Sequence, residues 1–160
     1  MTAAPTKPPV AEGAALMMTT AALLEQGRTL DGLSRLLTAG AVMLLLLLAF
    51  FGDQMPFERS ALLAAALALA ALLGLAQLYF AFRVGFDAAL FRRLATDPTP
   101  TGLEALDAGL EELGLRPATA GARPIGDRIR GARRLLRRQA LCLTLQLATI
   151  IVAAGVLALE

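Results

Sequence analysis

The sequence predicts an all-α integral membrane protein with three transmembrane helices. Hydrophobic residues make up 57% of the 160 residues, and the mean hydropathy is +0.65. The hydrophobic fraction exceeds the 45–50% that is usual for soluble domains. The sequence also contains three long apolar runs, and the last, from Ala140 to Leu159, is 20 residues without a charge. That length suffices for a helix to cross the hydrocarbon core of a bilayer.

The amino-terminal third divides into a polar tail, an amphipathic helix and a first span. Residues 1–13 hold three prolines and show no apolar periodicity, so we expect them to be disordered. Residues 14–35 have leucines seven residues apart, which predicts an amphipathic helix on the cytoplasmic side. We expect this helix to pack on the protein itself; the alternative is a membrane-surface anchor, which its few basic residues disfavour. The first transmembrane helix is assigned to residues 36–52.

The middle of the chain contains a tight connection and a second span. Residues 53–60 form an external loop around Pro56, and residues 61–82 form transmembrane helix 2. No proline occurs between Arg59 and Asp97, so the second helix is expected to continue into the cytoplasm, with Gly85 as its weakest point.

The cytoplasmic region, residues 83–139, is predicted to be a helical hairpin that a short amphipathic helix bridges. Thr101 and Glu104 have the spacing of a capping box, and Gly114 stands where a helix often ends. The bridging helix, residues 102–113, carries one leucine stripe, which we expect to pack on the helical extensions or on the amino-terminal helix. The stripe consists of Leu103, Leu106, Leu110 and Leu113. Residues 140–160 form transmembrane helix 3.

The basic residues predict the orientation. Fourteen of the fifteen lie before the first span or between the second and third, and only Arg59 lies in the short connection. Because cytoplasmic loops are enriched in Lys and Arg, the amino terminus is predicted to be cytoplasmic and the carboxyl terminus external. The high Arg and Ala content favours a bacterial source, so the predicted location is the bacterial inner membrane.

One side of the last helix, just before its apolar half, is strongly basic. We expect it to contact anionic lipid headgroups, with an acidic partner protein as the alternative. Nucleic acid is disfavoured, because no aromatic residue is interleaved to stack on bases. This arginine face consists of Arg130, Arg133, Arg134, Arg137 and Arg138.

The sequence shows no constellation of residues that is typical of a catalytic or metal site. There is no histidine and only one cysteine, which argues against a bound metal or haem. Apart from Glu160 at the last position, the predicted spans contain no charged residue, which argues against a proton-coupled transporter formed by this chain alone. We therefore expect no cofactor and no enzymatic activity.

Small and neutral-polar residues form two stripes within the spans, and such stripes are typical of close helix packing. The stripe in the second span consists of Ala66, Ala70, Gly74 and Gln77, and that in the third consists of Cys142, Gln146 and Thr149. The stripes pack either within one bundle or against another copy or another membrane protein. Gln77 and Gln146 lie about 9 and about 12 Å inside the cytoplasmic interface. We expect them to bond directly, through Thr149 or through a water molecule.

Two functions fit these expectations. The first is a non-enzymatic accessory, assembly or regulatory subunit of the inner membrane, which acts through intramembrane and cytoplasmic helix contacts. The alternative is a homo-oligomeric pore or small transport protein in which a polar stripe faces a water path.

Overall fold

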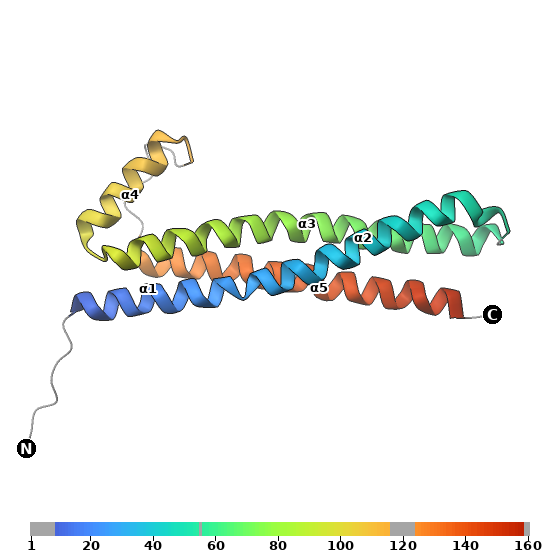
Figure 1. Cartoon of the computed structure of the whole chain (residues 1–160), viewed down its shortest axis with the longest axis horizontal. Helices are drawn as coiled ribbons and strands as arrows, with labels where there is room; N and C mark the ends of the chain where they lie inside the picture. The colour runs from blue at the N-terminus through green and yellow to red at the C-terminus, as the bar shows by residue number, and fades with distance from the viewer. Residues whose placement is uncertain (1–8, 55, 116–123, 159–160) are drawn as a thin grey trace, which may run out of the picture.

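The computed structural model describes residues 9–54, 56–115 and 124–158, and their regular structure is entirely helical. Three helical rods in it are long and apolar enough to span a membrane, which confirms the predicted all-α membrane class (Figure 1). The elements are α1 (Pro9–Glu25), α2 (Gly27–Phe51), the 3-10 turn η1 (Gly52–Gln54), α3 (Phe57–Thr96), α4 (Pro100–Glu112) and α5 (Ile125–Ala158).

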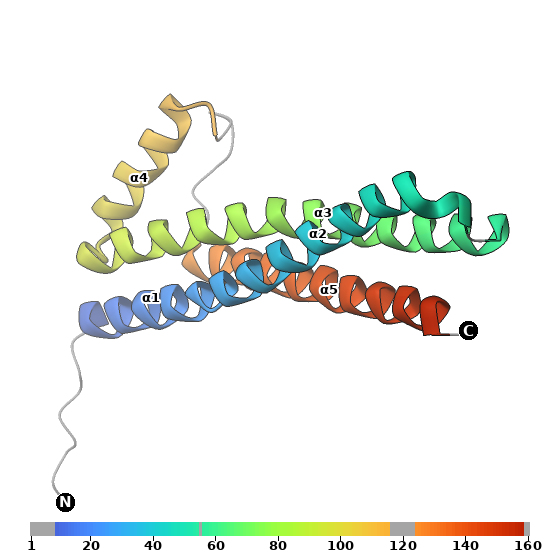
Figure 2. The same cartoon turned by 45° about the vertical axis from the view of Figure 1, so that its right-hand side comes forward.

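The bundle consists of three long rods that lie side by side. α1 and α2 form one rod with a break at Gln26, α3 runs antiparallel to it, and α5 runs back along α3 (Figures 1 and 2). The 40 residues of α3 span about 60 Å, twice the thickness of a bilayer core. A large part of the bundle must therefore extend beyond the hydrocarbon. We call the end that carries α4 the α4 end, and the opposite end, where α2 turns into α3, the turn end.

Two boundaries differ from those that the sequence suggested. α1 begins at Pro9, inside the stretch expected to be disordered, because the fixed φ of proline suits the first turn of a helix. Residues 1–8 lie outside the described residues. α3 passes through Gly85 without interruption, since a single glycine lowers helix stability by only about 1 kcal/mol relative to alanine.

The core changes in character along the bundle. Near the α4 end, α1, α3 and α5 bury large side chains such as Met17, Leu24 and Phe91. Near the turn end, the core is built largely from alanines, among them Ala41, Ala70 and Ala153. Small side chains allow the helix backbones to approach closely where lipid surrounds the bundle.

Leu16 and Leu23, which are seven residues apart, do not belong to the buried face of the amino-terminal rod. Leu16 is 50% exposed and Leu23 is 36% exposed, whereas Gly27, Ser34 and Ala41 are buried at the same spacing of seven. The small side chains of α2 let it approach its neighbours closely, and this close packing selects the inner face of the rod. The α1 segment still packs on α3 and α5, through Met17 and Leu24.

The helix α4 leans away from the bundle (Figure 2). Its first turn is capped by Thr99, whose hydroxyl accepts a hydrogen bond from Gly102 N at 3.1 Å, and not by Thr101 as the sequence suggested. Its end follows the predicted pattern, because Gly114 has a φ of +66° and Leu115 N donates to Leu110 O. Only Leu103 and Leu106 of its leucine stripe pack against the core of the bundle.

Candidate functional site

The most complete polar contact joins α2 to α5 inside the bundle. Ser34 Oγ donates to Gln146 Oε1 at 2.7 Å, and Gln146 Nε2 donates to Thr38 Oγ1 at 2.9 Å. Thr38 Oγ1 in turn donates to the Ser34 carbonyl at 2.7 Å. Gln146 has no exposed surface, so these hydrogen bonds replace those that its amide would otherwise make to water. We call this group, together with Gly74, the Gln146 layer.

Gly74 of α3 makes the Gln146 layer possible. A Cβ atom at this position would collide with Thr38 Oγ1 and would lie 2.8 Å from Gln146 Nε2. The missing side chain therefore lets α3 cover the polar contact between α2 and α5. By this arrangement one small residue and three polar residues fix the relative position of three helices.

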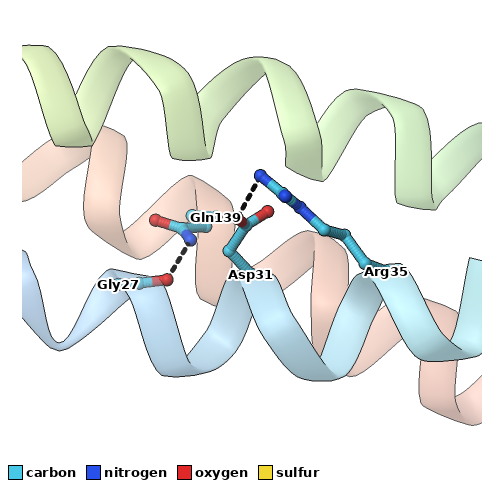
Figure 3. A network of polar contacts seen from close by, with 4 residues as sticks. All are labelled: Gly27, Asp31, Arg35 and Gln139. Atoms are coloured by element: carbon cyan, nitrogen blue, oxygen red, sulfur yellow. Dashed lines mark hydrogen bonds and ion pairs between the residues drawn. The ribbon is translucent and has the colours of Figure 1, made fainter.

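A second polar contact lies nearer the α4 end. Gln139 Nε2 donates to the Gly27 carbonyl at 2.7 Å, where α2 begins, and Asp31 pairs with Arg35 at 2.6 Å one turn further on (Figure 3). Gly27 is needed here as well, because a Cβ would lie 2.9 Å from Gln139 Oε1. Gln139 and Gln146 are seven residues apart, so both face α2.

Gln77 has a different environment from the one that the sequence suggested. It is fully buried, yet neither atom of its amide has a hydrogen-bond partner among the described residues. The expected direct bond to Gln146 is absent, because Gln146 uses its amide on Ser34 and Thr38. Thr149 does not bridge them either, since its hydroxyl donates to Leu145 O of its own helix.

The other stripe residues take two kinds of position. Ala66 and Ala70 are buried against the neighbouring helices, whereas Cys142 and Thr149 are only half-buried. A contact with a second copy or with another membrane protein therefore stays a prediction for the half-buried pair. Among the described residues, no group of His, Cys, Asp and Glu side chains is placed to hold a metal ion.

The residues of the arginine face are all exposed on α5. Arg130 pairs with Asp127 of its own helix, and within the described part of the chain the other four make no ion pair. The face is accessible to lipid headgroups or to an acidic protein, and the choice between them stays a prediction.

A groove of about 560 Å³ separates α4 from α3 and α5. The ion pair between Asp107 and Arg128 crosses from α4 to α5 and holds the two helices together. Burial in this groove raises the pKa of Asp87, and the nearby Arg83 guanidinium partly opposes that shift. A smaller, more apolar groove of about 450 Å³ lies between α4 and α3.

Several of these residues were missed by reasoning from the sequence. Ser34, Thr38 and Gln139 were not singled out, although Gly27–Ser34–Ala41 and Gln139–Gln146–Ala153 each recur at intervals of seven. Arg59 was counted only as a charge. Its guanidinium donates to the Val156 carbonyl at 2.7 and 3.0 Å, and so caps the carboxyl end of α5.

Comparisons with protein-family models, with curated proteins and with solved structures find no match to this chain.

Gly74→Ala should destabilise the bundle, because its methyl group meets Thr38 and Gln146. Overpacking of this kind costs about 1–3 kcal/mol. Gly85→Ala is the matched control, since nothing lies within 4 Å of its added Cβ, and it should be neutral or slightly stabilising. Adding Thr38→Ala to Gly74→Ala should restore part of the loss. The thermal midpoint in detergent measures all three, and equal effects of the two glycine variants would contradict the close approach.

Gln146→Leu and Gln77→Leu should change stability in opposite directions. The first removes bonds worth about 0.6–1.7 kcal/mol in a membrane bundle. The second removes a buried amide that has no partner in the described chain, and such a group costs about 1–3 kcal/mol. The free energy of unfolding in mixed micelles is the measurement. Equal destabilisation by both variants would show that Gln77 has a partner.

Proposed function

We propose that this chain is a non-enzymatic accessory, assembly or regulatory subunit of the inner membrane, with α4 and its adjoining grooves as the contact surface. The observation that carries this proposal is the position of α4, which leans away from the bundle and has no fully buried residue. Its sequence is amphipathic, so a partner that covers its apolar side would stabilise it.

The apolar groove between α4 and α3 supports a helical partner. It is bordered by Leu110 and Leu113 on one side and by Phe86 and Leu90 on the other. Leu113 is 72% exposed and the adjoining Leu115 is 62% exposed. Apolar side chains presented together at the mouth of a groove are the usual surface for an amphipathic helix.

The alternative, a homo-oligomeric pore, has less support. A water path along the polar stripe would need exposed polar side chains, but Gln77, Gln139 and Gln146 have no exposed surface. Gln146 is also fully bonded within its own chain. These contacts favour a role for Gln139 and Gln146 in holding the bundle together.

The arrangement of the basic residues supports the predicted orientation, with the α4 end in the cytoplasm. The arginine face lies in the half of α5 next to α4, where anionic headgroups and the positive-inside rule would both place it. Arg59 is the exception at the turn end, and its guanidinium donates to the Val156 and Leu157 carbonyls of α5.

The orientation is testable with single cysteines in a Cys142→Ala background. Gln54→Cys at the turn end should react with a membrane-impermeant thiol reagent in intact cells. Ala108→Cys on α4 should react only after lysis, because the inner membrane shields it. Both positions are exposed in the structure, so the difference reports the membrane alone. The reverse pattern would overturn the proposed orientation.

The contact surface is testable by photo-crosslinking in native membranes. A photoreactive residue at Leu113 should give a discrete adduct with another protein, and the same residue at Glu104, an exposed acidic position of α4, should not. Leu106→Asp should abolish the adduct, because Leu106 packs α4 on the core of the bundle. Equal labelling at both positions would contradict the proposal. Leakage of ions from reconstituted vesicles, above a protein-free control, would favour the pore.

A further inference from the structure

The larger groove between α3, α4 and α5 has two chemically different ends. Its far end is lined by apolar residues of α3 and α4, among them Leu90, Leu94 and Leu106. The end nearer the predicted spans carries Tyr79, Phe80, Arg83, Asp87 and Arg138. The second end lies where the apolar parts of α3 and α5 begin, which is the depth of lipid headgroups.

Arg83 and Arg138 come from different helices but lie at one level. A Cβ at Gly27 would lie 2.9 Å from Gln139 Oε1 and 3.2 Å from Val84 Cγ1, so Val84 of α3 and Gln139 of α5 meet at the same level of α2. Arg83 and Arg138 directly precede these two residues in the sequence, and both line the same groove. The groove therefore has one guanidinium from each side at its membrane end.

These two arginines have no carboxylate partner within 4.0 Å among the described residues. The other arginine that lines the groove, Arg128, is engaged with Asp107. Arg83 Nε donates to Tyr79 Oη at 3.3 Å, and its guanidinium lies 5.8 Å from the centre of the Tyr79 ring. Because Tyr79 is one turn closer to the middle of the span, Arg83 is turned toward the membrane.

We propose that this end of the groove binds the headgroup phosphate of an anionic phospholipid, held between Arg83 and Arg138. Two guanidinium groups can each offer paired N–H donors to one phosphate. Tyr79 and Phe80 border the site on its membrane side, where glycerol and the first acyl carbons of a lipid would lie. A freely diffusing phosphate would gain nothing from that aromatic border.

Asp87 provides a way to test whether the site binds an anion. Its carboxylate lies in the same groove and is four residues from Arg83, so it repels a bound phosphate and draws on the same guanidinium. Removal of this charge should strengthen binding of an anion. The lipid site is separate from the apolar groove proposed for a protein partner, so either proposal can fail without the other.

The experiment uses the full chain in detergent, titrated with phosphatidylglycerol or with phosphatidylcholine of the same acyl chains. Native mass spectrometry counts the lipid retained, and the thermal midpoint gives an independent readout. Phosphatidylglycerol should bind and stabilise, and phosphatidylcholine should do neither. The double variant Arg83→Gln/Arg138→Gln should weaken phosphatidylglycerol binding by roughly tenfold or more. Asp87→Asn should strengthen it.

The matched control is Arg133→Gln/Arg134→Gln, which removes the same charge from exposed positions of α5 that do not line the groove. It should weaken phosphatidylglycerol binding by clearly less than Arg83→Gln/Arg138→Gln does, because it removes only the diffuse attraction of the arginine face to anionic lipid. Equal weakening by both double variants would overturn the proposal, because it would show diffuse attraction to the arginine face. Equal affinity for phosphatidylcholine, or for soluble glycerol phosphate, would also overturn it, as would weaker binding by Asp87→Asn.

Discussion

The close approach of three helices at Gly74 is the constraint on which the rest of the bundle depends. With no side chain there, α3 can cover the bonds from Gln146 to Ser34 and Thr38 and exclude lipid from them. Slipping any helix by one turn would replace these bonds with buried, unpaired polar groups, at about 1–3 kcal/mol each. A leucine core has no such penalty, because leucine packs equally well on leucine or on lipid.

From this layer the buried positions repeat along each rod at intervals of seven. α5 buries Ala132, Gln139, Gln146 and Ala153, and α3 buries Leu63, Ala70, Gln77, Val84 and Phe91. A repeat of seven keeps one seam facing the neighbouring helices over the length of the rods. This regularity explains how one bundle can be continuous across two solvents. Only the size of the buried side chains changes, from small residues near the turn end to larger ones near the α4 end.

The membrane class and the end of α4 could be predicted because they rest on local sequence. A long apolar run and a glycine after a leucine stripe have the same meaning in almost any fold. The partner of Gln146 could not be predicted in the same way. The expected pairing of Gln77 with Gln146 rested only on their similar depth in the membrane. Depth does not say which side of a helix faces which neighbouring helix. The spacing of Gly27, Ser34 and Ala41 held that information, and the conspicuous leucines at the same spacing drew attention to the outward side.

The two ends of the bundle differ in how far their polar and apolar groups are bonded or covered within the chain itself. At the turn end, Arg59 bonds the Val156 carbonyl of α5, and the groove there, of about 360 Å³, is lined by apolar residues that lipid can cover. At the α4 end, α4 is held by few contacts, two grooves remain open, and Arg83 and Arg138 are without carboxylate partners in the described chain. A molecule that binds these exposed groups in the folded state only would stabilise that state. The physical case for an interaction surface is therefore strongest at the α4 end, where lipid and protein would bind in two adjoining grooves.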